Sequence, residues 1–145
     1  MIAEPQQRLP TAARTYWALR YAGIALLAGV AATATLGAWA AVLMLAGPAA
    51  GFGVAALRWR RWRYEVREDE IDLRHGVLTE RRTLVPIRRV QHVDTETGPL
   101  QSSFDLATVS FHTAAGRTSV PALTRAEAEG VRRRVAELAR SRDDT

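Results

Sequence analysis

The sequence predicts a membrane protein built as a two-helix transmembrane hairpin followed by an antiparallel β barrel or sandwich with one C-terminal α-helix. Three observations predict this fold class. Tyr21–Leu57 contains no charged residue and no His, Asn or Gln in 37 positions. From Tyr64 onward, apolar and polar residues alternate with a period of two, as in half-buried strands. After Thr124, apolar residues recur at helical spacing along a single segment.

The uncharged run is too long for one crossing. As a single helix it would extend about 55 Å, whereas the bilayer core is about 30 Å thick. We therefore expect two spans, at about residues 16–35 and 37–57, with the turn at Thr33, Thr35 and Gly37. Gly47 and Gly51 stand four apart, which permits close helix packing but also arises by chance in an Ala- and Gly-rich segment.

Three other interpretations of this run carry less weight. A cleaved signal peptide would use Ala38-Trp39-Ala40 as its cleavage site, but a second apolar run follows at once. A buried core hairpin of a soluble protein would need more cover than the 88 residues that follow Leu57. One kinked span with a re-entrant part is the third alternative.

The flanks of the run predict the topology. Residues 1–15 lack periodicity and should form a flexible leader, whereas residues 58–64 combine Arg with aromatic residues and should form a linker at the membrane interface. Arg residues flank both ends of the run, so we expect a multi-pass protein of the plasma membrane with both termini in the cytoplasm. A nucleic-acid patch is disfavoured because the cluster adjoins the span directly. The expected interface residues are Arg58, Trp59, Arg60, Arg61, Trp62 and Arg63.

Residues 65–141 should form one small domain of six or seven short strands and a final helix. Pro86 ends one strand, a corner follows at Ile87, and Leu100–Phe104 should be a short helical turn. Thr124 and Glu127 have the spacing of a capping box at the start of the last helix. Residues 142–145 should fray.

Composition excludes several classes of protein. The chain has no Cys, so it has no disulfide, no thiolate metal site and no Cys nucleophile. Its net charge is +5 and all twenty basic residues are Arg, but 17 of these stand against 14 acidic residues after Leu57. This is an ordinary mixed surface, and no nucleic-acid partner is expected.

An ordered set of short stretches resembles the bacterial PH-like domain of the YdbS/YdbT-type membrane proteins. The resemblance covers about residues 63–138, and short members of that family also place two spans before one such domain. The family usually has Gly near the position of Asp105. After Gly, Asp is among the residues that best tolerate a left-handed backbone. The stretches are Arg63–Val66, Ile71–Leu78, Val85–Val93, Gly98–Gln101, Leu106–Val109, Thr113–Gly116 and Glu127–Glu129.

The resemblance implies a membrane-bound module that acts by binding or assembly. Five residues of the family motif should be structural, because Pro86 stops a strand, Gln91 can bond the backbone at the corner, and Gly98-Pro99 sets the next turn. These five residues are Pro86, Gln91, Gly98, Pro99 and Leu100.

Catalytic and metal chemistry find little support in the sequence. His92, Asp94 and Glu96 share one strand face and have the residue types of metal ligands, but a solvated polar face is the favoured interpretation. Hydroxyl, acidic and His residues occur without a nucleophile-elbow motif, and no phosphate-binding glycine loop is present. We therefore expect no enzyme activity, no cofactor and no metal.

Four arginines are the best candidates for a site: Arg81, Arg82, Arg88 and Arg89. Guanidinium groups bind phosphate in a bidentate manner, although pairing with surface carboxylates such as Glu80 is the favoured alternative. The leading hypothesis is a non-enzymatic scaffold that assembles with a membrane-protein partner or as a homo-oligomer. The alternative is that the domain binds anionic lipid headgroups.

Overall fold

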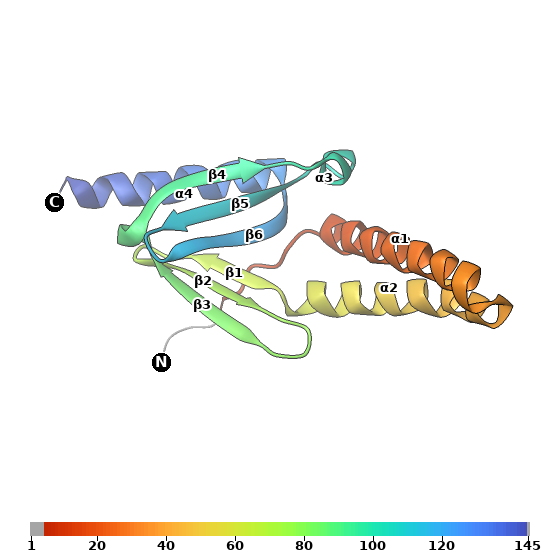
Figure 1. Ribbon diagram of the computed structural model, residues 1–145. Coiled ribbons are helices and arrows are strands. Elements are labelled where there is room, and N and C mark those ends of the chain that lie inside the picture. Colours follow the sequence, from red (N-terminus) through yellow and green to blue (C-terminus); the bar gives the residue numbers. More distant parts are fainter. Residues whose placement is uncertain (1–4, 145) are drawn as a thin grey trace.

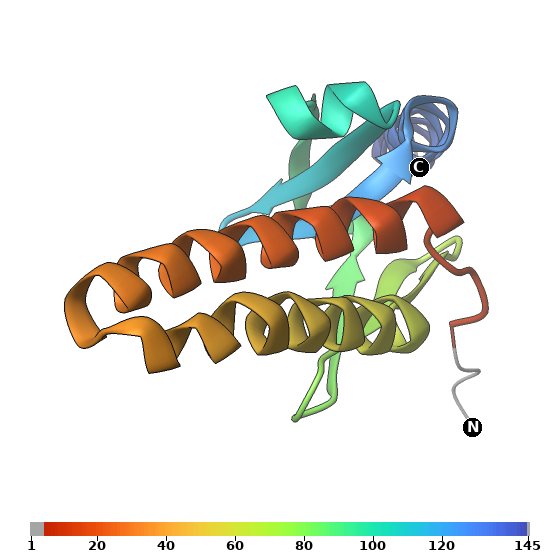
Figure 2. The same ribbon diagram turned by 90° about the vertical axis from the view of Figure 1, so that its right-hand side faces the viewer.

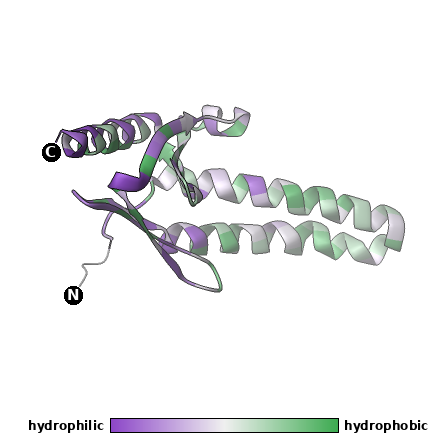
Figure 3. Ribbon diagram, turned by 60° about the vertical axis from the view of Figure 1, so that its left-hand side comes forward, coloured by the Kyte–Doolittle hydropathy of each residue, from purple (hydrophilic) through white to green (hydrophobic). Residues whose placement is uncertain are grey.

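A helical hairpin projects from a β-rich domain in the computed structural model, which describes residues 5–144 (Figure 1). Helix α1 (Thr11–Leu36) leads away from the domain, the 3-10 turn η1 (Ala38–Val42) reverses the chain, and α2 (Leu43–Arg61) returns. Apolar residues dominate both helices (Figure 3). Both segments are long and apolar enough to cross a membrane, and only 6% and 17% of their apolar windows are buried. They are therefore not the core of a soluble domain.

Small residues set the contact between the two helices. A Cβ atom added at Gly47 would lie 3.1 Å from Ala25, and one added at Gly51 would lie 3.1 Å from Tyr21. Gly29 is equally close to Met44, at 3.0 Å. These glycines therefore serve close helix packing, as in other membrane hairpins.

The turn of the hairpin lies later than expected. Thr33 and Thr35 remain helical, and their hydroxyls donate back to the carbonyls of Gly29 and Ala31 at 2.9 and 3.0 Å, which satisfies these polar groups within the apolar helix. Only Gly37 of the three expected turn residues leaves the helix, with φ of 100°. This conformation favours glycine.

The expected flexible leader is wrong for the described residues that precede Tyr16. Gln7 exchanges two backbone hydrogen bonds with Tyr64, of 3.1 and 2.9 Å, and Leu9 is 2% exposed. The helix already begins at Thr11. Pairing between residues so far apart in sequence leaves no local periodicity, so the pattern of residues 5–10 did not reveal it. Residues 1–4 lie outside the described part.

The expected interfacial linker is also absent as a separate segment. Helix α2 continues through Arg61, Trp62 caps it, and strand β1 begins at Arg63. The transmembrane hairpin and the domain are thus joined without a spacer.

Within residues 5–144, six strands form two antiparallel sheets of three strands each, in the orders β1-β2-β3 and β4-β5-β6. The short turn η2 (Ile87–Arg89) makes the expected corner, and the helical turn α3 (Pro99–Ser103) follows β4. The strands are β1 (Arg63–Val66), β2 (Glu70–His75), β3 (Arg81–Pro86), β4 (Val90–Glu96), β5 (Leu106–Thr113) and β6 (Gly116–Thr124). This architecture confirms the predicted β sandwich with a final helix.

Helix α4 (Arg125–Asp143) covers the second sheet (Figure 1). Its capping box is present, since the Glu127 amide donates to the Thr124 hydroxyl at 3.1 Å. Ala128 and Val135 are buried against the core, in which Phe111 is fully buried. The helix continues to Asp143, beyond the expected fraying point, and Arg142 forms an ion pair with Asp69. Thr145 lies outside the described residues.

Asp105 adopts the expected left-handed conformation, with φ of 55°. Its position after α3 lets the chain turn into β5, and its carbonyl accepts a hydrogen bond from the Arg125 amide at 3.2 Å. The short polar side chain tolerates this backbone better than most residues.

Candidate membrane-interface site

The four arginines predicted as a site lie at two different places. Arg81 and Arg82 open β3 beside the β2–β3 turn, whereas Arg88 and Arg89 lie in η2 after its other end. The strand separates the two pairs by about 20 Å. Figure 1 places the β2–β3 turn near α2 and places η2 at the end of the domain away from the hairpin. They therefore cannot act as a single cluster.

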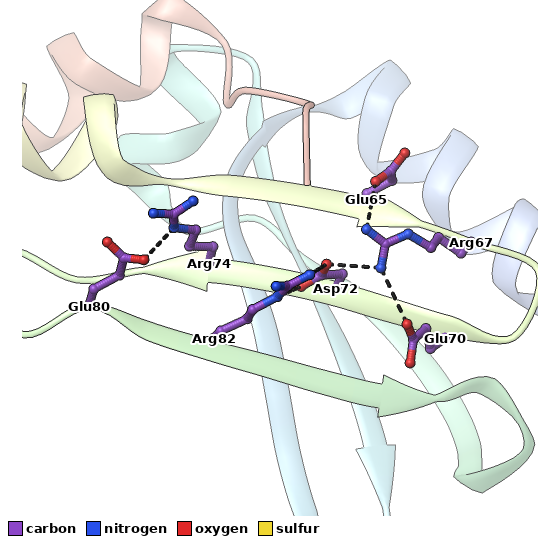
Figure 4. Close-up of polar contacts among 7 residues, drawn as sticks. All are labelled: Glu65, Arg67, Glu70, Asp72, Arg74, Glu80 and Arg82. Atoms are coloured by element: carbon purple, nitrogen blue, oxygen red, sulfur yellow. Dashed lines mark hydrogen bonds and ion pairs between the residues drawn. The ribbon is translucent and has the colours of Figure 1, made fainter. Parts of the chain in front are cut away.

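Arg82 is engaged in a structural network around Asp72 (Figure 4). The Asp72 side chain is completely buried and contacts Arg82 at 2.7 Å and Arg67 at 2.9 Å. Burial acts to raise the pKa of Asp72, but hydrogen bonds from Arg82 and Arg67 outweigh it and hold the pKa below its usual value. Glu65 and Glu70 complete the network through Arg67. Arg82 therefore holds the first sheet together.

The far pair has polar and acidic neighbours. Arg88 lines an open hollow of about 680 Å³ that includes Glu68 and Arg142. Within residues 5–144, neither Arg88 nor Arg89 forms an ion pair. They lie at the end of the domain away from the hairpin (Figure 1).

Trp59 and Trp62, which the sequence predicts at the membrane interface, join the hairpin to the domain. Trp62 is 4% exposed and stacks on His75 with ring centroids 4.9 Å apart. The Trp59 ring nitrogen donates to the carbonyls of Leu9 and Pro10 at 3.1 and 3.0 Å. This packing explains why the two parts need no flexible linker.

Arginines from α2, β1 and β2 surround a polar hollow at the junction with the hairpin, which we call the arginine pocket. It measures about 300 Å³ and has four arginines against one carboxylate, that of Glu80. The register of β1 against β2 brings Arg63 directly opposite Arg74, and α2 supplies the other two arginines. The pocket is lined by Pro5, Gln6, Arg60, Arg61, Arg63, Arg74 and Glu80.

The electrostatics of this region favour an anion. The pKa of Arg63 is lowered by burial and then by repulsion from Arg8 and Arg74, yet the group stays cationic at neutral pH. The pKa of His75 is likewise lowered by burial and then by Arg58 and Arg81. Glu80 contacts Arg74 and offsets one charge (Figure 4). A phosphate group in the pocket would relieve the remaining repulsion.

The β2–β3 turn projects below α2 in Figure 2. The Arg61 guanidinium donates to the carbonyl of Val77 at 2.6 Å, and the side chain of Leu78 is 96% exposed. Gly76 has φ of 135°, and a Cβ atom there would lie 1.9 Å from the Thr79 carbonyl oxygen. Only glycine fits this turn, which holds an apolar side chain at the level where α2 ends.

The five motif residues have different surroundings. Pro86 ends β3, and Gly98-Pro99 starts α3, where the Gly98 amide donates to the Gln101 side chain at 3.0 Å. Gln91 is exposed and its side chain makes no hydrogen bond to other described residues, in contrast to the expected bond at the corner. Leu100 is 39% exposed on α3, which Figure 1 places near the start of α1.

Similarity to known proteins agrees with this architecture. Residues 22–139 match the family described as Bacterial PH domain. The chain belongs to this bacterial PH domain family. It is 44% identical over 108 residues to UPF0699 transmembrane protein YdbS of Bacillus subtilis (strain 168), a match that covers 74% of this chain and 68% of YdbS.

A second relative in Bacillus subtilis (strain 168) is UPF0699 transmembrane protein YdbT. The chain is 29% identical to it over 83 residues, which is 54% of this chain and 17% of YdbT. No solved structure matches the chain. The two apolar helices and the transmembrane relatives identify a membrane protein with a PH-like domain, as the sequence predicted.

The sequence did not single out the arginine pocket as a site. The sequence predicted Arg60, Arg61 and Arg63 only as interface residues and did not predict Arg74 as part of any site. The signal that could have found them is the register of β1 with β2, which follows from the tight turn between Val66 and Glu70.

Proposed function

We propose that the protein is a non-enzymatic, membrane-anchored PH-like module whose arginine pocket binds the headgroups of anionic lipids. The observation that carries this proposal is the gathering of four arginines around one hollow beside the end of α2. Arg is suited to phosphate because its planar guanidinium donates two parallel hydrogen bonds. The pocket lies where the uncharged part of α2 gives way to Arg58, which is the expected level of lipid headgroups.

Because the domain is tethered to the membrane, weak contacts with lipid headgroups are sufficient for binding. A domain joined directly to a membrane helix meets headgroups at high effective concentration. Each arginine near an anionic surface contributes about 1 kcal/mol. We propose the plasma membrane as the site, with both termini in the cytoplasm, because Arg residues flank both ends of the hairpin. Leu78 would enter the interface beside the pocket and add an apolar contact.

The test compares two double variants, each of which replaces two arginines by glutamine. Full-length protein in detergent receives phosphatidylglycerol or phosphatidylcholine, and native mass spectrometry measures bound lipid. We expect phosphatidylglycerol to bind preferentially, and Arg60→Gln with Arg74→Gln to weaken it by roughly 30-fold, from about 1 kcal/mol per charge. Arg88→Gln with Arg89→Gln, at the far end, should leave binding unchanged. Equal losses in the two pairs, or no preference between the lipids, would contradict the proposal.

A scaffold function is the second candidate, and the edge of the second sheet favours it. Strand β4 is the outer strand of its sheet, and most of its side chains are exposed. An open edge can accept a further strand from a partner or from a second copy. Light scattering of the full chain in detergent, with co-purification of membrane proteins, tests this function. A protein that stays monomeric and retains no membrane partner would exclude it.

A further inference from the structure

Two histidines and one aspartate lie together on one face of the second sheet. None of them lines the arginine pocket. His92 on β4 and His112 on β5 are direct cross-strand partners, and Asp94 follows on the same face of β4. The two imidazole rings are stacked, with centroids 4.2 Å apart and planes 10° from parallel. Phe111, which alternates with His112, points to the buried core. The cluster therefore lies on the outer face of the sheet.

The distances in this cluster match those between ligands of one metal ion. The Asp94 Oδ2 atom lies 3.1 Å from His112 Nε2 and 3.6 Å from His92 Nε2. One ligand atom from each residue lies within 4.8 Å of the others. Around a tetrahedral zinc ion with bonds of about 2.0–2.1 Å, neighbouring ligand atoms lie about 3.4 Å apart. To bind one ion, the two stacked imidazole rings would tilt apart so that both Nε2 atoms and the Asp94 Oδ2 atom point to the same position.

The state of His112 supplies a second, independent observation. Its Nε2 atom is buried and has no hydrogen-bond partner among the described residues, although Asp94 is close enough for an ion pair. The angle between the two groups is therefore unsuitable for a hydrogen bond. A buried polar nitrogen without a partner calls for an explanation such as a missing ion. A buried nitrogen that is 3.1 Å from a carboxylate oxygen but not hydrogen-bonded to it is compatible with both atoms binding one ion.

Neighbouring charges leave the carboxylate of Asp94 available. Arg117 pairs with His112 across β5 and β6, and would repel a cation if its guanidinium lay over the cluster. The guanidinium is instead directed to Ser119 and Glu96, at 3.4 and 3.8 Å. Glu96 thus pairs with Arg117 and is no ligand, whereas within residues 5–144 the partners of the Asp94 side chain are the two histidines alone.

We propose that His92, Asp94 and His112 bind a divalent transition-metal ion of the zinc type. Imidazole and carboxylate ligands suit such ions, and three protein ligands leave at least one coordination position open to water or to a ligand from a partner. The ion would tie the outer strand β4 to β5. This proposal does not depend on lipid binding in the arginine pocket, and each of the two is tested by its own experiment.

The test uses the purified full chain in detergent, prepared without a histidine tag and stripped of metal with a chelator. Isothermal titration with zinc chloride should show one saturable site per chain. His92→Ala should weaken the affinity at least tenfold, and this side chain is 59% exposed, so its removal leaves the fold intact. Asp94→Asn, which keeps the shape of the side chain, should have the same effect.

Glu96→Gln is the matched control, because it removes a carboxylate from the same strand and should leave zinc affinity unchanged. Zinc should also raise the unfolding temperature of the wild-type chain and of Glu96→Gln but not that of His92→Ala, since a ligand that binds only the folded state stabilises it. No saturable site in the wild type, or equal affinity in His92→Ala and the wild type, would overturn the proposal.

Discussion

The two ends of β3 carry the same pair of residues in different surroundings. At the end near the hairpin, Arg82 contacts a buried carboxylate and the arginine pocket lies close by. At the other end, Arg88 and Arg89 follow the strand on a turn that faces away from α1 and α2 (Figure 1). A run of arginines therefore has no function by itself. Its role depends on which residues the strand register brings next to it and on whether it lies near the membrane.

The largest expected difference between the ends concerns their glycine turns. Gly76 lies in the β2–β3 turn, which we call the near turn, and Gly116 lies in the β5–β6 turn of the second sheet, which we call the far turn. The two glycines have φ of 135° and 136°, but of these two only Gly76 would place a Cβ atom against backbone. We expect Gly76→Ala to lower the free energy of unfolding by about 3 kcal/mol or more, because strain and a clash add together. Gly116→Ala should cost about 1 kcal/mol from strain alone.

Denaturant unfolding of the full chain in detergent, followed by circular dichroism, measures both changes. Equal losses in the two variants would show that the Gly76 turn relaxes freely, and the near end would then not be held more tightly than the far end.

The Asp72 network gives the next largest effect. Asp72→Asn should lower the free energy of unfolding by about 2 kcal/mol, since Arg82 and Arg67 lose a charged partner but retain access to water. Arg88→Gln at the far end should change stability by less than about 0.5 kcal/mol.

The pH dependence of this effect has a definite sign. The folded pKa of Asp72 lies below its usual value, so its stabilisation is present above the unfolded pKa of about 4 and is lost as pH falls through the folded pKa. Acid titration of the unfolding free energy should therefore show a loss in the wild type that is smaller in Asp72→Asn. Parallel acid profiles in the two proteins would contradict the assignment.

Local signals in the sequence predicted most of the fold. The uncharged run predicted the hairpin, and Thr124 and Glu127 predicted the start of α4. The left-handed conformation of Asp105 was expected from the family resemblance. The sites depended on contacts that have no local signal. Arg74 meets Arg63 only through strand register, and His112 meets His92 only because of an irregularity in register after Val90.

The smallest effect on stability, and the sharpest comparison of position, concerns Leu78 in the near turn and Ala115 in the far turn. Both are exposed, and the chain has no Cys, so a single cysteine at either position can carry an environment-sensitive fluorophore. In nanodiscs, the probe at Leu78→Cys should emit at shorter wavelength and be quenched by spin-labelled lipids, because Arg61 holds this turn beside the end of α2. The probe at Ala115→Cys should resemble a probe in water. Leu78→Ser should weaken retention of phosphatidylglycerol by only a fewfold, since it removes one apolar contact of about 1 kcal/mol and leaves every arginine in place. A water-like probe at Leu78 would place the near end of the domain away from the bilayer and would remove the physical basis for headgroups reaching the arginine pocket.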